Sequence, residues 1–300
     1  MNMSSVFSIL YRQYNKYIAI PLAQRKLRDI HIMNSIDSIQ YIIDKKCSVS
    51  RFGDGEFFVL MGGGNSFQEP DLMLSKRLKD VLTKVDAPNH IVGLPVPMKS
   101  TKGIYKHGKD FWSFFTLRYV DTLLPYLSSK RRYVDTQLSR FYVIYEDRSK
   151  CGNQLALLKK IWDDRDVLIV EGNKSCTGVG NDLYDNAKSL QRILGPATNA
   201  FSMYNEMYSA IKKYARKDQL ILLSYGMTAT VLAYDLAKDG YWAIDIGHLD
   251  LEYEWFKLGV DDVTAIKGKF TNEAKTQGGH DVEDCYDPKY LSQIVCDITK

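Results

Sequence analysis

The stretch Asp166-Val-Leu-Ile-Val170, followed at once by Glu171-Gly172, decides the fold of this sequence. It is a short, almost unbroken apolar run rich in β-branched residues, which is typical of a strand buried on both faces of a parallel sheet. The segments on either side of it, residues 153–163 and 181–194, are predicted to be helices. A buried strand between two helices is the repeating unit of an α/β protein.

The same alternation continues in both directions from this unit. The spacing of apolar residues predicts helices over 71–85, 203–215 and 228–238, and strands over 90–94, 219–224 and 241–246. Apolar strands that alternate with helices indicate a Rossmann-like, mostly parallel sheet with helices on both faces. No internal repeat or low-complexity linker divides the chain.

Composition limits the class of protein. With 300 residues, of which 45% are hydrophobic and 25% charged, the chain has the balance of a globular protein rather than a disordered one. Its formal charge of +4 is too small for a protein that coats nucleic acid, so no nucleic-acid partner is expected. The five cysteines are widely spaced and form no C-x-x-C pair, which favours a reduced, cytoplasmic protein and argues against a zinc ribbon.

We predict a helical extension over residues 1–46 and a single domain over residues 47–300. The extension mixes tyrosines with basic residues, and polar residues interrupt the apolar core that an export signal needs. A short basic helix of this kind usually packs on the body of its protein with its charges in water. The alternative is peripheral contact with an anionic membrane, at the inner face of the cell membrane.

Ligands of parallel sheets bind beyond the carboxyl ends of the strands, so the loops there carry the candidate site. The loop after the central strand holds three glycines, among them Gly178 and Gly180, which would let backbone N–H groups approach an anion at a helix start. It matches neither a Walker A motif nor G-x-G-x-x-G, and alone it is more typical of a turn capped by Asn181 or Asp182. A second glycine turn precedes Thr228, and two such helix starts on one sheet edge favour a phosphate-bearing ligand.

The loop after the strand predicted over 241–246 concentrates titratable side chains: His248, Asp250, Glu252 and Glu254. If a helix begins just after His248, Asp250 and Glu254 share one face and Glu252 points away. The helix dipole favours acids in a first turn, but it does not account for the histidine. A histidine beside acids at the carboxyl end of a strand is a candidate ligand or general base.

The sharpest short motif is Asp54-Gly-Glu56, within Ser50-Arg-Phe-Gly-Asp-Gly-Glu-Phe57. In an extended segment these two carboxylates lie on the same side, because side chains alternate between faces. Both would then reach one divalent cation, and hard oxygen ligands suit Mg²⁺ or Mn²⁺ better than zinc. The simpler interpretation of an isolated motif of this kind is a turn with solvated acids.

Together, these segments resemble the GT-D glycosyltransferases, a bacterial family that extends glycans from nucleotide-sugar donors. The stretch Arg51-Phe-Gly-Asp-Gly-Glu56 is similar to the D-x-E signature of that family. The resemblance runs from about Cys47 to the C-terminus, and further motifs that carry it are Ser139-Arg140, Val170-Glu171-Gly172, Gly178-Val-Gly-Asn-Asp-Leu183, Thr228-Ala229 and Asp245-Ile-Gly-His-Leu-Asp-Leu-Glu-Tyr-Glu-Trp255. In the glycine loop this chain has Lys174 and Ser175 where members often carry Arg.

The resemblance implies a GT-D type fold, a UDP-sugar donor, Mn²⁺ or Mg²⁺, and a glycan or glycoprotein acceptor, with inversion at the anomeric carbon. It agrees with the assignment of the metal to Asp54 and Glu56. The residues expected to bind the donor are Arg51, Gly53, Arg140, Glu171, Gly172, Gly178, Gly180, Asn181, Asp182 and Thr228. The candidates for the general base are Asp250 and Glu252, with His248 as a metal ligand, phosphate donor or alternative base.

Two other functions stay open at this point. A metal-dependent phosphohydrolase or nucleotidyl transferase would use the same acids and glycine loop, and would release phosphate or pyrophosphate rather than UDP. A non-catalytic nucleotide-binding scaffold of polysaccharide assembly would bind a partner and cleave no donor. The transferase is favoured because several motifs match in the order of the family; the sequence indicates no donor sugar, linkage or oligomeric state.

Overall fold

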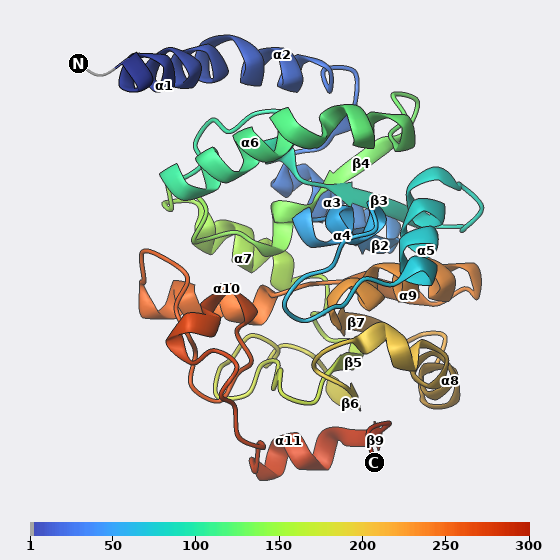
Figure 1. Cartoon of the computed structure of the whole chain (residues 1–300). Coiled ribbons are helices and arrows are strands. Elements are labelled where there is room, and N and C mark those ends of the chain that lie inside the picture. The colour runs from blue at the N-terminus through green and yellow to red at the C-terminus, as the bar shows by residue number, and fades with distance from the viewer. Residues whose placement is uncertain (1–2) are drawn as a thin grey trace.

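The computed structural model describes residues 3–300, and in this part of the chain nine strands form one sheet (Figure 1). The sheet order is β1-β4-β3-β2-β8-β7-β5-β6-β9, and all neighbouring strands are parallel. The strands are β1 (His31–Ile32), β2 (Ser48–Arg51), β3 (His90–Leu94), β4 (Arg132–Asp135), β5 (Asp166–Gly172), β6 (Ser189–Gly195), β7 (Leu220–Ser224), β8 (Trp242–Asp245) and β9 (Ile294–Asp297). The predicted α/β fold with a parallel sheet is confirmed.

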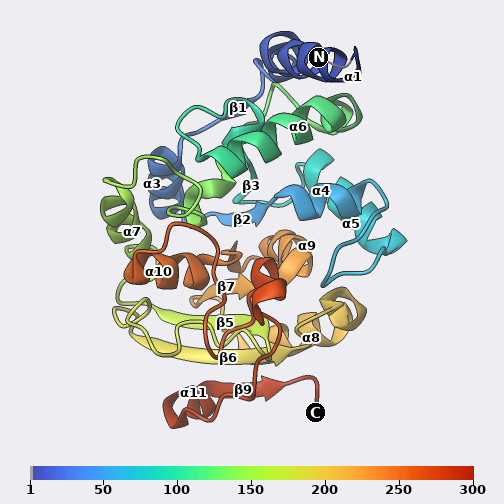
Figure 2. The ribbon, with the colours of Figure 1, turned by 60° about the vertical axis from the view of Figure 1, so that its left-hand side comes forward.

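Helices cover both faces of this sheet (Figure 2). One face is covered by α3 (Ser35–Lys45), α7 (Cys151–Lys159) and α10 (Leu249–Leu258). The other is covered by α4 (Asp54–Leu60), α5 (Leu72–Thr83), α6 (Lys106–Leu123), α8 (Tyr204–Tyr214) and α9 (Gly226–Lys238). The remaining α-helices are α1 (Met3–Tyr14), α2 (Ile20–Arg25) and α11 (Pro288–Gln293).

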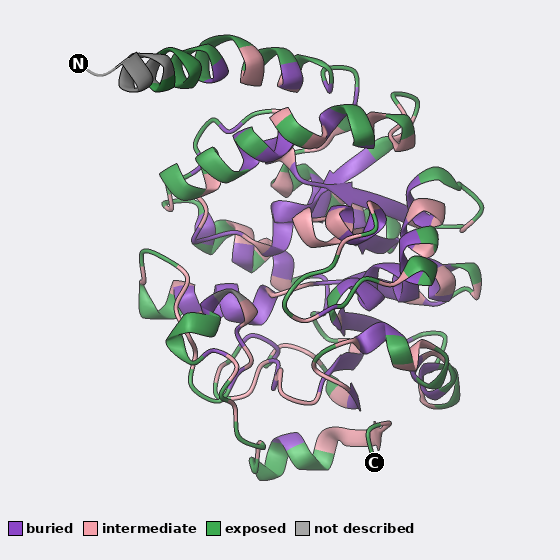
Figure 3. Cartoon of the chain, in the orientation of Figure 1, coloured by how far each residue is buried: buried purple, intermediate pink, exposed green. Residues whose placement is uncertain are grey.

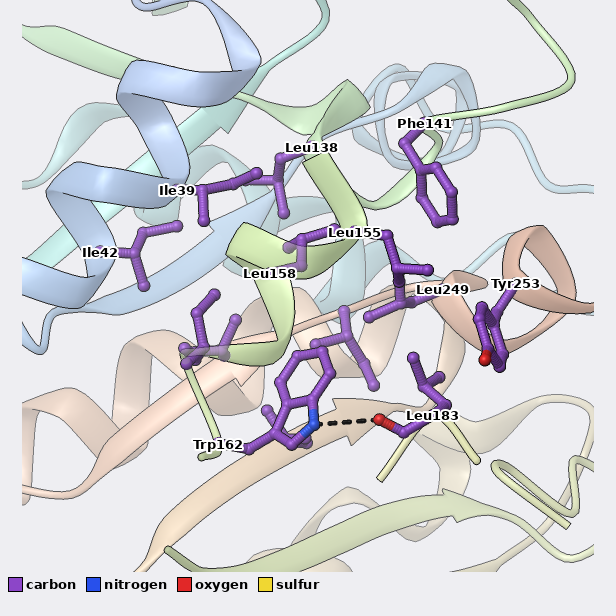
Figure 4. Packing of buried hydrophobic residues seen from close by; sticks show 14 of the residues in the cluster. Ile39, Ile42, Leu138, Phe141, Leu155, Leu158, Trp162, Leu183, Leu249 and Tyr253 are labelled. Atoms are coloured by element: carbon purple, nitrogen blue, oxygen red, sulfur yellow. Dashed lines mark hydrogen bonds between the residues drawn. The ribbon is translucent and has the colours of Figure 1, made fainter. Parts of the chain in front are cut away.

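Strand β5, the stretch that decides the fold, lies in the half of the sheet that is formed by β8, β7, β5, β6 and β9. Strand β5 pairs with β6 on one side and β7 on the other, and Val167 through Gly172 are buried. Against it packs a core that includes Trp162, Leu183 and Leu249 (Figure 4). The indole Nε1 of Trp162 donates a hydrogen bond of 3.1 Å to the Leu183 carbonyl, which holds the second half of the loop between β5 and β6.

The helix predicted over residues 181–194 is wrong. Residues 189–195 form strand β6, which pairs along its whole length with β5, and turns occupy most of the segment before it. The apolar residues Leu190, Ile193 and Leu194 fit a helical spacing as well as a strand. Pairing with β5 satisfies their backbone and buries Ile193 and Leu194, so tertiary context decides between the two.

The predicted N-terminal extension is helical at its start, but part of it is built into the domain. Strand β1 pairs with β4 at the edge of the sheet. Helix α3 places Ile39 and Ile42 in the same core as Trp162. A boundary at residue 46 therefore stays a prediction. In the described part of the chain, no helix has the length and apolar character needed to cross a membrane.

Candidate active site

A cavity of about 480 Å³ opens at the carboxyl ends of the central strands. Its walls include the last residues of four strands, Arg51 of β2, Gly172 of β5, Ser224 of β7 and Asp245 of β8. Strand β2 connects forward to β3 on one side and lies against β8 on its other side, so the order of the sheet reverses there. This is the position at which open parallel sheets bind their ligands, and the volume lies within the range of about 300–1,000 Å³ usual for ligand pockets.

Asp54 and Glu56 both line the cavity, but the extended geometry predicted for them is wrong. They lie in the first turn of α4, for which Gly53 is the N-cap residue. The Glu56 carboxylate accepts a hydrogen bond of 2.7 Å from the Gly53 backbone N–H, which satisfies one of the free donors at the helix start. The two acids line the cavity because the N-terminus of α4 lies at its wall. Alternation of side chains along a strand has no part in their position.

The charge environment of Glu56 is unfavourable for an ionised carboxylate. Burial, together with the nearby carboxylate of Asp245, raises the pKa of Glu56 to about 7. Asp245 is itself buried, and burial raises its pKa as well. The Arg51 guanidinium, which lines the same cavity, favours the ionised forms of both acids and offsets part of this effect.

The basic side chain that lies beside Glu56 and Asp245 is Arg51. Its Nη1 lies 3.5 Å from Asp245 Oδ1, and its Nε and Nη2 donate to the Thr136 carbonyl at 3.3 and 3.2 Å. Gly247 has a positive φ of 50°, and a Cβ at that residue would overlap the guanidinium. Glycine is therefore required at position 247 for Arg51 to occupy the end of the sheet.

The N-terminus of α9 also faces the cavity, through Tyr225, Gly226 and Met227. This 13-residue helix presents backbone N–H groups and the positive end of its dipole there, as predicted for a phosphate-binding terminus. Thr228 lies in its first turn, fully buried, and does not itself line the cavity. Its Oγ1 has no hydrogen-bond partner among the described residues.

Helix α10 brings His248, its N-cap residue, and Asp250 to the cavity. As predicted, Asp250 and Glu254 share a helix face, and both contact the same two side chains. Lys269 Nζ lies 2.7 Å from Asp250 Oδ2 and from Glu254 Oε1, and Asn181 Nδ2 donates to the two acids at 2.8 and 2.7 Å. Burial raises the pKa of Asp250, while the Lys269 ammonium favours its ionised form.

Glu252 does not line the cavity, so the structure does not place it where a general base is needed. It is fully buried, and Arg140 Nε lies 3.0 Å from its Oε1. Its other oxygen accepts hydrogen bonds of 3.0 and 3.3 Å from the backbone N–H groups of Tyr142 and Val143. Glu252 thus positions the loop that carries Arg140, and Arg140 is the member of the pair that reaches the cavity.

Glu171 is also buried behind the cavity wall rather than in it. Its carboxylate lies 2.6 Å from Arg192 Nη1 and accepts a hydrogen bond of 2.7 Å from the Thr177 backbone N–H. These contacts tie the loop after β5 to β6. Gly172 and Thr177 line the cavity as a result, whereas Glu171 supports them from behind.

The rest of the glycine loop, residues 178–182, does not line this cavity. This corrects the phosphate contact that the sequence predicts for these residues. A second cavity of about 440 Å³ is lined by Gly178, Gly180, Asn181 and Asp182. No helix follows the loop, so the helix start expected to bind an anion there does not exist. Asn181 is used instead to bridge Asp250 and Glu254, and the Asp182 carboxylate accepts a hydrogen bond of 2.6 Å from the Tyr253 hydroxyl.

One wall of the first cavity was missed at the level of sequence. Tyr105, His107, Phe111 and Trp112, at the start of α6, line it. The aromatic residues in the segment 105–112 are the only sequence signal, and nothing in their spacing links them to the loops after the strands. Asp245 also lines the cavity, and as the last residue of a buried strand it carries no signal in the sequence that separates it from a structural acid.

In the described part of the chain, no three His, Cys, Asp or Glu side chains form a group that could hold a metal ion. Asp54 and Glu56 both line the cavity, and their carboxylate oxygens fit a metal that takes the rest of its ligands from a substrate. Mg²⁺ commonly binds in this way, through one or two carboxylates together with substrate phosphates and water.

A family model, described as the glycosyltransferase GT-D fold, matches residues 49–274. The chain belongs to the GT-D fold glycosyltransferase family. The match begins within β2 and ends beyond α10, so it includes every element that lines the first cavity.

Two curated relatives and two solved structures support the same assignment. One relative is the probable glycosyl transferase Gly of Streptococcus gordonii, which is 37% identical over 93% of this chain. Another is the glycosyltransferase GlyD of Streptococcus pneumoniae, which is 37% identical over 94% of this chain. The chain spans only 40% and 34% of those relatives. A structure described as a new glycosyltransferase from Streptococcus sanguinis has 36% identity and a TM-score of 0.83, covering 89% of this chain and 99% of its own. A second, described as the domain of unknown function 1792 with a distinct glycosyltransferase fold, has 34% identity and a TM-score of 0.86, covering 92% of this chain and 98% of its own.

Proposed function

We propose that this protein transfers a hexose from a UDP-sugar to a hydroxyl of a glycan or glycoprotein acceptor, with inversion at the anomeric carbon. The observation that carries the proposal is that Asp54 and Glu56 line the same cavity as the N-terminus of α9. A nucleoside diphosphate needs both features, because its charge must be neutralised while its sugar departs.

The donor diphosphate is proposed to lie between the start of α9 and the acids of α4. Backbone N–H groups at Gly226 and Met227 would donate to phosphate oxygens. Arg51 and Arg140, which line the same cavity, add positive charge as the leaving group forms. Tyr105, Phe111 and Trp112 supply the ring surfaces on which a nucleobase stacks.

Asp54 and Glu56 are the residues that would hold Mn²⁺ or Mg²⁺, and Asp245 lies close enough to Glu56 to raise its pKa. When bound, the ion supplies Lewis-acid stabilisation of the departing diphosphate. Without a cation, burial and the charge of Asp245 make the ionised form of Glu56 costly. The unfavourable electrostatics of Glu56 is thus the property of this chain that supports a metal at that position.

Asp250 is proposed as the general base. The acceptor oxygen attacks the anomeric carbon, the bond from that carbon to the diphosphate oxygen breaks, and the acceptor proton passes to the Asp250 carboxylate. Lys269 and Asn181 orient this carboxylate, and the Lys269 ammonium favours its ionised form against the effect of burial. His248, at the same end of α10, is the alternative base.

A donor screen tests the proposal. The protein is incubated with a panel of UDP-, GDP- and dTDP-sugars, with Mn²⁺ and with EDTA, and release of nucleoside diphosphate is measured. The expected result is metal-dependent release of UDP from one or two UDP-hexoses. Release of phosphate or pyrophosphate instead would identify a hydrolase or nucleotidyl transferase. Binding of UDP without cleavage of any donor, in the presence of candidate glycan acceptors, would identify a scaffold.

A further inference from the structure

The N-terminal helices carry an apolar stripe that the rest of the described chain leaves exposed. Most of the described part of these helices is coloured as exposed in Figure 3. Leu10, Tyr14, Ile18 and Leu22 follow one another at intervals of four residues, from α1 through the π-helical turn Asn15–Ala19 into α2. They and the adjacent tyrosines Tyr11 and Tyr17 are 47–67% exposed. A run of large apolar side chains in water on one helix face indicates a surface that another phase or molecule covers.

Another face of α2 is already occupied. Ala23 and Leu27 are buried in the core, and α2 packs on α6. Lys26 also lies 2.6 Å from an oxygen of Asp121, on α6. In both views the α1–α2 rod lies along the outer side of α6 (Figures 1 and 2). The body of the protein therefore holds the rod by one face and directs the exposed stripe outward.

The charge of this segment identifies what it binds. Residues 1–28 contain five bases, Arg12, Lys16, Arg25, Lys26 and Arg28, and no acid. Their formal charge of +5 exceeds the +4 of the whole chain, so the remainder is slightly acidic. Arg12, Lys16 and Arg25 are all exposed. Arg25, three residues after Leu22, borders the stripe, whereas Arg12 and Lys16 lie two residues from members of the stripe and so on the polar side of the helix. Lys26 and Arg28 are paired with Asp121 and Asp29, which leaves Arg12, Lys16 and Arg25 as the bases available to a partner. A helical segment with a tyrosine-rich apolar face, exposed bases and no acid of its own is complementary to an anionic bilayer, whose phosphates meet the bases and whose acyl boundary meets the stripe.

We infer that residues 10–28 dock this protein on the surface of an anionic lipid bilayer, with the helices in the plane of the interface. The stripe enters the boundary between headgroups and acyl chains, and the bases remain at the level of the lipid phosphates. Because α2 packs on α6, and the first half of α6 lines the cavity, docking fixes the orientation of the cavity relative to the membrane. The inference concerns lipid binding alone and does not depend on the reaction proposed for the cavity.

Flotation with lipid vesicles tests the inference. The full chain is mixed with vesicles of phosphatidylcholine alone, or of phosphatidylcholine with about one third phosphatidylglycerol, at low and high salt. We expect binding to the anionic vesicles that weakens with salt, and at least tenfold weaker binding to the neutral ones. The variant Arg12→Gln/Lys16→Gln/Arg25→Gln should bind anionic vesicles roughly 100-fold more weakly, since each base near the surface contributes about one factor of five.

Two further variants complete the test. Tyr14→Ser/Ile18→Ser/Leu22→Ser retains every base and should still lose at least tenfold in binding, because charge alone does not insert the helices. Lys130→Gln/Lys188→Gln/Lys213→Gln removes three exposed bases elsewhere and should bind as the unmodified chain does.

Equal loss in the two triple base variants would overturn the inference, because binding would then follow net charge. Absence of binding to anionic vesicles would also overturn it. Sedimentation without lipid supplies the remaining check: a dimer that the serine variant abolishes would assign the stripe to a second copy of this chain.

Discussion

Two groups of acidic side chains lie at or near the same cavity, and they differ in the partners that the fold provides for their charge. The acids around α10 and β5 have basic partners from the chain itself: Lys269 for Asp250, Arg140 for Glu252 and Arg192 for Glu171. Glu56, at the start of α4, instead has a backbone N–H as its hydrogen-bond donor and a second carboxylate nearby, and its pKa rises to about 7. Glu171 and Glu252, which are paired behind the cavity wall, hold the structure in place, whereas Glu56 lies at the wall with its ionised form disfavoured, where a bound cation would stabilise it.

The largest effect is expected for an acid that the chain neutralises. Glu171→Gln should lower the free energy of unfolding by about 3–5 kcal/mol, because it leaves the buried Arg192 without its ion-pair partner. Urea unfolding measures the loss. The matched control is Asp166→Asn at the other end of β5, whose partner Arg216 is half exposed, and it should cost at most about 1 kcal/mol. Equal losses in the two variants would remove the distinction between buried and exposed pairs.

Changes to the acids of α4 should lower activity without unfolding the protein. Asp54→Asn and Glu56→Gln are each expected to lower the rate of sugar transfer by about 10²- to 10³-fold, because each removes charge that supports the departing diphosphate. Far-ultraviolet circular dichroism should stay unchanged. Glu206→Gln, an exposed first-turn acid of α8 away from the cavity, serves as the control and should be fully active. An Asp54→Asn enzyme with a normal rate in saturating Mn²⁺ would contradict the metal role.

A matched pair on α10 sharpens the comparison within one cluster. Asp250 and Glu254 share Lys269 and Asn181, but only Asp250 lines the cavity. Asp250→Asn should lower kcat by about 10²-fold with little change in the KM for the donor, as expected for loss of a base. Glu254→Gln should keep kcat within a factor of about three. A loss confined to donor affinity in Asp250→Asn would move the role of base to His248.

The smallest expected effect is a dependence of stability on pH. The pKa of Glu56 is raised in the folded protein, so the folded state holds this proton to higher pH than the unfolded chain. Its contribution is present below about pH 4.5 and is lost as the pH rises through about 7. Glu56→Gln keeps an oxygen for the Gly53 N–H and should become more stable than the unmodified protein by about 2 kcal/mol at pH 8, but not at pH 4. A pH-independent difference in the free energy of unfolding would exclude this account.

Several features of the fold and site could be predicted because they depend on neighbouring residues. The apolar run at β5 predicts a buried strand, and the i, i+4 spacing of Asp250 and Glu254 predicts their shared face. Where local signals compete, the prediction is wrong: residues 189–195 fit a helix until β5 supplies hydrogen-bond partners. The two acids of the Asp54-Gly-Glu56 motif reach the cavity, as expected, but from a helix terminus rather than a strand.

By itself, the sequence determined that apolar strands alternate with helices, that acids and glycines follow those strands, and that the N-terminal segment is basic and aromatic. Only the tertiary structure decided which of these acids are paired with a basic side chain. Glu171 forms an ion pair with Arg192, which lies 21 residues further along the chain. Glu252 forms an ion pair with Arg140, and more than a hundred residues separate the two in the sequence. The reason is physical: the spacing of residues fixes the face on which a side chain lies, but its charge environment depends on burial and on partners that only the packed sheet brings together.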